Sequence, residues 1–249
     1  MFDFSSDDIN KYSLACLRAA NIYAAEFKTS CVKPAIINSL RGANPIVKIV
    51  EKVLKSVGIE PTVYLLPTSG FLYQRDEVIY EGLKDIFDKE LISGIGNLIF
   101  IDTMISGSSL RGFKQKFKKL INHEFINELE SKLITFSFIG IKENHNNYQE
   151  NYNEHSFGTN NLVLKSYVLP AGDIMTEDVP ELLGVDYPFN SNDKSLKLPI
   201  TSEVKSSEPI RVDGLVFQSN KTTSELFQDI ILNEIYKIMK NNLVKQFNY

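Results

Sequence analysis

The stretch from Asn97 to Gly112 constrains this chain more than any other part of its sequence. The apolar run from Leu98 to Ile101 is typical of a buried strand, and it ends on an acid, Asp102. A loop of small, hydroxyl-bearing residues comes next, and a basic amphipathic segment follows it. A strand, a tight loop and a helix amino terminus together form a phosphate site, because backbone N–H groups and the helix dipole both favour negative charge there. The sequence therefore predicts a phosphorylated sugar or nucleotide as the ligand.

Helices and strands are expected to alternate along the rest of the chain. Helices are predicted over 7–28, 45–57, 76–92, 110–120, 124–129 and 224–240, and strands over 35–40, 62–66, 98–102, 133–141 and 162–168. Such alternation is typical of parallel strands joined by right-handed crossovers. We predict one α/β domain over 1–249, Rossmann-like, with a mostly parallel sheet flanked by helices. Its core is expected over about 30–170, and an irregular C-terminal elaboration over about 171–249.

Local signals indicate where several of these elements begin and end. Ser5 or Ser6 is placed to cap the first helix, and Asn44 is placed to cap the second, with Pro45 at its first position. Residues 143–160 are rich in Asn, Tyr, Glu and His and show no period. We therefore expect them to form either a long surface loop or a mobile segment.

Composition and charge exclude several classes of function. The chain has 249 residues, 43% of them hydrophobic, and a net charge of −4, so general attraction to nucleic acid or to anionic membranes is not expected. No apolar run approaches the roughly 20 residues of a membrane-spanning helix. Cys16, Cys31 and the three histidines follow no disulfide or metal-ligand pattern, and the acidic amino terminus is unlike a signal peptide. We expect a cytoplasmic protein whose partner is a small molecule.

The sequence from Leu98 to Ser109 resembles the phosphate loop of the type I phosphoribosyltransferases. Members of this family carry an apolar strand, an acidic pair, two small residues and a Thr/Ser-Gly-x-Thr/Ser loop. Without a gap, Asp102 takes the second acidic position, and the resemblance implies that it binds the ribose hydroxyls of phosphoribosyl pyrophosphate (PRPP). The residues implied to hold the phosphate are Thr103, Ser106, Gly107, Ser108 and Ser109.

A second match lies upstream, where the predicted strand 35–40 runs into Arg41 and Gly42. Members of the family bind pyrophosphate with a short loop at this place. Arginine offers a planar fork of donors for phosphate oxygens, and glycine lets the backbone approach closely. The resemblance spans about 30–142 and implies catalytic roles for Arg41 and Asp102. It also implies Mg²⁺, held through pyrophosphate and ribose oxygens rather than by direct protein ligands.

The residues that follow the second predicted strand, about 68–76, lie where the family carries a mobile hood over the site. The resemblance implies that Tyr73 and Arg75 can reach a pyrophosphate or a base from this loop. A solvated surface loop is the alternative interpretation.

Two departures from the family pattern leave two functions open. Ile101 stands in place of the first acid, and Ile105 stands where a small residue is usual. One hypothesis is a Mg²⁺-dependent enzyme that transfers phosphoribosyl to or from a base. The other is a catalytically impaired sensor of PRPP or a nucleotide that acts through a protein partner, since some members are regulators and others occur in phage-defence loci. A different sugar-phosphate enzyme and a plain strand-to-helix turn are weaker alternatives, and family members commonly form homodimers.

Overall fold

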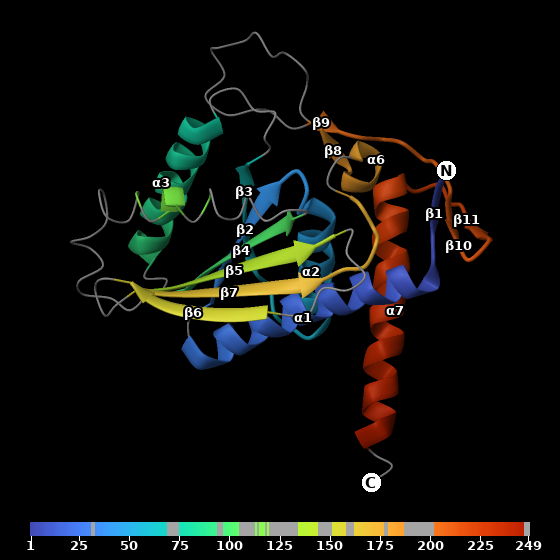
Figure 1. The fold of residues 1–249 in the computed structure, drawn as a ribbon, viewed down its shortest axis with the longest axis horizontal. Coiled ribbons are helices and arrows are strands. Elements are labelled where there is room, and N and C mark those ends of the chain that lie inside the picture. Colours follow the sequence, from blue (N-terminus) through green and yellow to red (C-terminus); the bar gives the residue numbers. More distant parts are fainter. Residues whose placement is uncertain are drawn as a thin grey trace.

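A six-stranded sheet organises the molecule, which is described here from a computed structural model (Figure 1). Its strands lie in the order β3-β2-β4-β5-β7-β6, and all are parallel to their neighbours except β6. They comprise β2 (Ala35–Leu40), β3 (Thr62–Pro67), β4 (Asn97–Met104), β5 (Ile134–Lys142), β6 (Asn151–Phe157) and β7 (Leu162–Pro170). The structure describes residues 1–30, 33–68, 75–93, 97–104, 113, 115–117, 119, 134–143, 151–157, 162–176, 179–186 and 202–246.

Helices cover both faces of this sheet, which confirms the predicted α/β class with a mainly parallel, Rossmann-like sheet. Alternate residues of β4 point to opposite faces, so Ile99 and Ile101 belong to one core and Leu98 and Phe100 to the other. The first core is covered by α1 (Ser6–Ser30), α2 (Asn44–Ser56) and α7 (Thr223–Gln246). The second is covered by α3 (Arg75–Ser93) and by residues that follow β4. No helix in the described part of the chain combines the length and apolar character that a membrane crossing requires.

The second core is built largely from phenylalanine rings. Phe113, which follows β4 in sequence, stacks on Phe100 with ring centroids 3.8 Å apart. Phe117 lies against Phe136 of β5 with ring centroids 4.0 Å apart. These fully desolvated rings fix the segment after β4 to the face of the sheet that α3 also covers.

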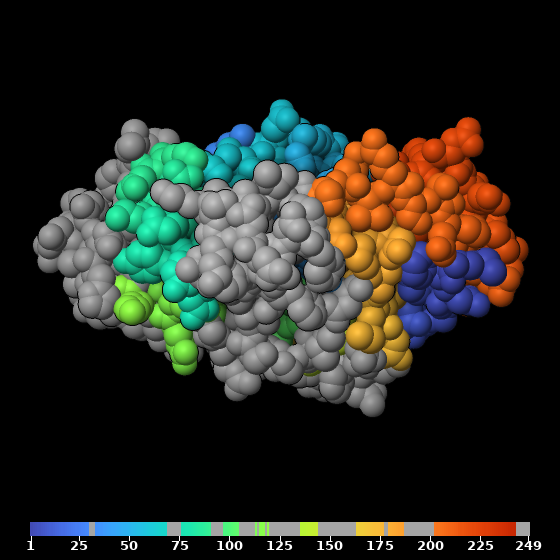
Figure 2. Space-filling model, turned by 90° about the horizontal axis from the view of Figure 1, so that it is seen from above, coloured from blue at the N-terminus to red at the C-terminus, as the bar shows by residue number. Residues whose placement is uncertain are grey.

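The carboxyl-terminal part of the chain is more regular than the sequence predicts. It contains α6 (Pro180–Leu183), the paired strands β8 (Val185–Asp186) and β9 (Ser202–Glu203), and the hairpin of β10 (Ile210–Val212) and β11 (Leu215–Phe217). β10 pairs in parallel with β1 (Phe2–Phe4), so the amino-terminal strand joins the hairpin that precedes α7. In Figure 2 the blue amino-terminal residues and the orange carboxyl-terminal residues lie together at one end of the molecule, and α3 lies at the other.

The structure corrects some local expectations from the sequence and confirms another. The stretch 143–160 is not wholly a loop, because it contains β6, which pairs antiparallel with β7 at the edge of the sheet. Ser5 does cap α1, since its Oγ accepts a hydrogen bond from the Asp8 N–H at 3.1 Å. Asn44 does not cap α2: the N-cap is Ala43, and Pro45 is the second helical residue.

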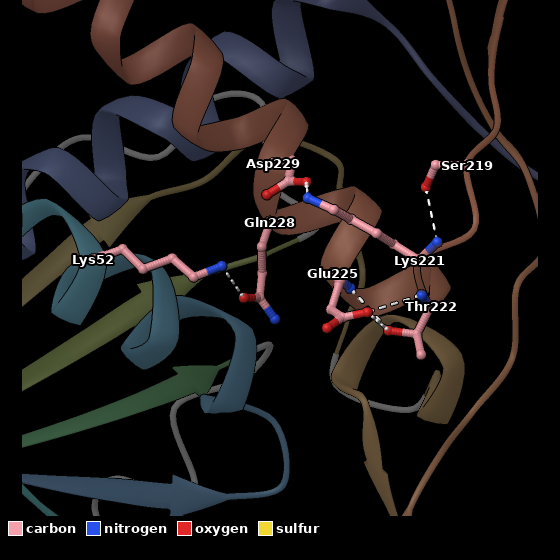
Figure 3. A network of polar contacts seen from close by, with 7 residues as sticks. All are labelled: Lys52, Ser219, Lys221, Thr222, Glu225, Gln228 and Asp229. Carbon is pink, nitrogen blue, oxygen red and sulfur yellow. Dashed lines mark hydrogen bonds and ion pairs between the residues drawn. The ribbon is translucent and has the colours of Figure 1, made fainter.

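The amino end of α7 is held by a network of polar contacts (Figure 3). The Thr222 N–H donates to the Glu225 carboxylate at 2.9 Å, and the Glu225 N–H donates to Thr222 Oγ1 at 3.3 Å. This reciprocal pair is a capping box, which satisfies N–H groups that the helix leaves without an intrahelical partner. Lys52 of α2 donates to Gln228 at 3.0 Å and so ties α7 to the helix that follows β2.

The capping box generates a prediction about pH. The backbone N–H of Thr222 is the main cause of a lowered pKa at Glu225. A carboxyl whose pKa is lower in the folded state stabilises the fold above its unfolded pKa, and this contribution is lost as the pH falls through the folded pKa. We therefore expect Glu225→Ala to reduce the free energy of unfolding by about 0.5 kcal/mol near neutral pH, because the exposed carboxylate is screened by solvent, and by much less at about pH 3.

Denaturant unfolding at a series of pH values checks this expectation. Glu225→Gln is the matched control, because an amide keeps the capping contact but does not titrate. A destabilisation by Glu225→Ala that stayed constant across the whole pH range would contradict the role assigned to this carboxylate.

Candidate functional site

The two loops that the sequence assigns to phosphate chemistry begin at neighbouring places in the fold. β2 and β4 are adjacent and parallel, and Asn38 is in register with Ile101. Arg41 therefore directly follows β2 on the side of the sheet where Asp102 lies near the carboxyl end of β4. Figure 1 shows the arrowheads of the parallel strands pointing to the side where α6, β8 and β9 lie.

The chain leaves β2 and β4 towards opposite faces of the sheet. After β2, α2 packs on the core that contains Ile36 and Ile101. After β4, Phe113 packs on the other core, against Phe100. The carboxyl ends of β2 and β4 therefore form a topological switch point. In open α/β sheets, ligands bind in the crevice at such a point, beyond the carboxyl ends of the strands.

The loop between β2 and α2 is tight and largely buried. The Ala43 N–H donates to the Ser39 carbonyl and the Asn44 N–H to the Arg41 carbonyl, both at 3.1 Å. The Leu40–Arg41 peptide bond is cis, and Gly42 is buried. The Arg41 side chain, 12% exposed, forms an ion pair with Asp186 of β8. The structure thus gives the predicted anion-binding arginine an internal carboxylate partner that the sequence does not indicate.

Thr68 supports this loop from the neighbouring strand end. Its N–H and its hydroxyl both donate to the Leu40 carbonyl, at 3.0 and 3.2 Å, and the hydroxyl also contacts Ser39 Oγ. All three residues are buried. The position of Arg41 is therefore fixed by hydrogen bonds between β2 and the residue that follows β3.

Asn44 connects the loop to the carboxyl-terminal part of the chain. Its side-chain amide donates to the Leu183 carbonyl at 2.7 Å, and its Oδ1 accepts from Asn38 at 3.3 Å. This tertiary role explains why Asn44 does not cap its own helix. No side chain caps the amino end of α2 among the described residues; the Asn44 N–H there donates to the Arg41 carbonyl, and Pro45 has no N–H to donate.

Asp102 lies near the carboxyl end of β4, a central strand of the sheet, and is only 7% exposed. It is in register with Gly140 of β5, and Lys142 lies two residues further along the same face of β5, also 7% exposed. The register thus brings a carboxylate and an ammonium group to neighbouring positions on one face of the sheet. Sequence reasoning identified Asp102 but missed Lys142, because nothing in the sequence reveals which residue of the next strand lies opposite.

Two buried oxygen atoms at this edge have no hydrogen-bond partner among the described residues. They are Thr103 Oγ1 of β4 and Asn38 Oδ1 of β2, which lie on the face that α2 covers. A buried acceptor or hydroxyl that stays unpaired costs about 1–3 kcal/mol, so both atoms are suited to bind a water molecule or a ligand group. The role of Thr103 in ligand binding stays a prediction, since its side chain is almost fully buried.

A separate polar cluster lies under α1, beside the site. Glu143, fully buried after β5, accepts hydrogen bonds from the backbone N–H of Thr176 at 2.8 Å and from its hydroxyl at 2.5 Å. Burial, reinforced by the charge of Glu143, raises the pKa of both Tyr12 and Cys16 above their usual values. The Cys16 thiol is therefore kept protonated, which excludes it as an activated nucleophile.

The remaining predicted site residues are placed only in part. Ser106, Gly107, Ser108, Ser109, Ile105 and Tyr73 lie outside the described residues, and Arg75 is the first residue of α3, with its side chain outside the described part. Within the described ranges, no group of three or more His, Cys, Asp or Glu side chains is arranged to hold a metal ion. No protein-family model, curated protein or solved structure matches this chain.

α6 fixes the segment that reaches Arg41. Leu182 and Leu183 are buried, and Gly184 ends the helix at φ 71° with its carbonyl accepting from the Val204 N–H at 3.1 Å. A Cβ atom on Gly184 would lie 2.7 Å from Ser224 Oγ at the start of α7. The turn that leads to Asp186 therefore requires both the left-handed backbone of glycine and its lack of a side chain.

We predict that Gly184→Ala destabilises the protein more than Gly58→Ala does. Gly58 also has a positive φ, 80°, but nothing lies within 4 Å of the added Cβ, so this control measures the backbone cost alone, about 1 kcal/mol. Gly184→Ala adds the overlap with Ser224, for an expected total of about 2–4 kcal/mol. Urea unfolding of the two variants checks the difference, and equal losses would show that α6 is not seated tightly against α7.

Proposed function

We propose that this chain is a divergent type I phosphoribosyltransferase-like protein that binds PRPP, or a ribose-phosphate nucleotide, between the ends of β2 and β4. The observation that supports this most directly is the convergence of the Arg41 loop and Asp102 at the switch point of a parallel sheet. The Arg41 loop and Asp102, which are far apart in the sequence, thereby lie at the same ends of neighbouring strands, in the order that the family resemblance implies.

Each residue has a role that follows from its chemistry. Arg41 offers bidentate donors to pyrophosphate oxygens, and Gly42 lets those oxygens approach the backbone. Asp102 accepts hydrogen bonds from ribose hydroxyls, and its buried carboxylate stabilises positive charge that develops on the sugar. The reaction breaks the bond between the anomeric carbon and pyrophosphate, while a nitrogen of the acceptor base forms the new bond to that carbon.

The residues present also fit the implied magnesium ion. Mg²⁺ is usually held by one or two carboxylates together with substrate phosphate oxygens, not by a complete protein cage. The resemblance implies that the ion would be held through pyrophosphate and ribose oxygens, while Asp102 would bind the ribose hydroxyls next to it. When bound, the ion neutralises charge on the departing pyrophosphate.

A specific observation favours the alternative function, a sensor that binds the same ligand with impaired turnover. Ile101, which stands in place of the first family acid, is 1% exposed and packs in the core under α2. It therefore supplies no polar group to the site, and Asp102 is left to perform alone a task that the family divides between two acids. Weaker charge stabilisation reduces turnover more than it reduces binding.

The test combines binding and turnover on the full chain. We expect isothermal titration calorimetry to detect PRPP with Mg²⁺, and Arg41→Ala and Asp102→Asn each to weaken binding at least tenfold, since each removes a charge-assisted contact worth about 1.4 kcal/mol or more. Pyrophosphate release with a panel of bases then separates the enzyme from the sensor. Lys89→Ala on the exposed side of α3 is the control for loss of a positive charge.

Four results decide between the alternatives and test the site. Pyrophosphate release that depends on Arg41 and Asp102 supports the transferase, and binding without release supports the sensor. Wild-type affinity for PRPP in both variants would overturn the proposed site, and so would the absence of any PRPP binding to the wild type and to its Asp186→Asn variant.

A further inference from the structure

The ion pair between Arg41 and Asp186 joins parts of the chain that are 145 residues apart. Both side chains are largely shielded from solvent, with Arg41 12% and Asp186 25% exposed. Arg41 is also the residue that the proposed function assigns to the pyrophosphate of the ligand. The carboxylate of Asp186 therefore lies on the group that an incoming anion has to bind.

The segment that carries Asp186 is fixed at both ends. Before it, the Leu183 carbonyl accepts from Asn44, two residues past the Arg41–Gly42 loop. After it, the Asp186 carbonyl accepts from Ser202 Oγ at 3.2 Å, and Val185 and Asp186 pair with β9. The carboxylate thus comes from a built turn anchored to the loop itself, not from a surface side chain that meets Arg41 by chance.

A carboxylate and a phosphate compete for the same donors of a guanidinium group, because both present two oxygens to its planar fork. A pyrophosphate bound to Arg41 would also place several negative charges beside Asp186, and like charges at close range repel. Asp186 takes Nη1 of Arg41, so a pyrophosphate that uses both terminal nitrogens of the guanidinium has to displace the carboxylate. A partly shielded ion pair has to be broken in that exchange, so it lowers the apparent affinity for the anion.

We propose that Asp186 is an internal competitor for the anion site: it occupies Arg41 in the ligand-free protein and is displaced by a pyrophosphate-bearing ligand. This inference rests on the proposed function for the identity of the ligand and extends it to regulation of that site. Its consequence is selectivity by charge, because a ligand with the several negative charges of a pyrophosphate replaces the carboxylate more effectively than a simple phosphate monoester. The displacement is transmitted to β8, β9 and α6, which hold Asp186 in place.

Calorimetric titration with inorganic pyrophosphate, and separately with PRPP and Mg²⁺, tests the competition on the full chain. Asp186→Asn keeps the shape of the side chain and removes its charge, so we expect it to bind pyrophosphate roughly tenfold more tightly than the wild type. The gain should vanish when Asp186→Asn is combined with Arg41→Ala, because the competition acts only through that arginine. Glu203→Gln, an exposed carboxylate on the paired strand, is the matched control and should leave the affinity unchanged.

The outcomes separate this inference from the proposed function. Tighter pyrophosphate binding by Asp186→Asn without any PRPP binding supports the competitor and overturns the function. Arg41-dependent PRPP binding that Asp186→Asn leaves unchanged or weakens supports the function and overturns the competitor. The absence of pyrophosphate binding to both the wild type and Asp186→Asn overturns the competitor as well.

A second variant and a second measurement apply if Asp186→Asn does not fold. Asp186→Ser removes the charge with a smaller side chain, and the same tenfold gain is expected of it. In the wild type, saturating pyrophosphate should accelerate hydrogen exchange of the Val204 amide, which donates to the Gly184 carbonyl next to β8. Unchanged exchange at Val204 when pyrophosphate is bound would show that Asp186 keeps its place, and would overturn the proposal.

Discussion

The parallel pairing of β2 with β4 is the constraint on which the rest of the structure depends. This register, with Ala35 opposite Leu98 and Asn38 opposite Ile101, brings two loops to one edge although they lie about sixty residues apart in the sequence. β2 and β4 are central strands, each paired on both sides, so the loops stand on rigid supports. Because α2 and Phe113 pack on opposite faces, the chain leaves β2 and β4 towards opposite sides of the sheet, as at a topological switch point.

In our proposal, the carboxyl-terminal elaboration regulates the site at the carboxyl ends of β2 and β4. α7 packs against α1 and α2, and its capped amino end lies beside Gly184, where α6 stops. α6 in turn presents a carbonyl to Asn44, and β8 presents a carboxylate to Arg41. In our proposal the Arg41 guanidinium has two competing partners: the Asp186 carboxylate within the protein, and the anionic ligand. How strongly Asp186 competes depends on how firmly α6 and β8 are held in place, not on Arg41 itself.

The sequence predicts the central sheet well because its strands are apolar runs. Strands such as Leu162–Pro170 and the helices between them carry clear periods, so their order and parallel arrangement could be inferred. β6 was missed because Asn151–Phe157 is largely polar and pairs only at an edge. Arg41 directly follows an apolar strand and Asp102 lies near the end of another, so the sequence predicts both as site residues. Lys142 and Asp186 were missed, since register and long-range packing, rather than local pattern, bring them to the site.

Competition between Asp186 and the ligand for Arg41 also bears on whether the protein is an enzyme or a sensor, and thermodynamic linkage shows how. If ligand and Asp186 exclude each other at Arg41, then anything that draws β8 away from the loop raises the affinity for ligand, and ligand raises the affinity for that agent by the same factor. A transferase needs no such coupling, because its product leaves and the carboxylate returns. For a sensor, the exchange at Arg41 is the event that changes the protein surface. Two residues therefore favour the sensor. Ile101 is buried and contributes no charge to catalysis, and Asp186 is anchored and couples the site to the carboxyl-terminal elaboration.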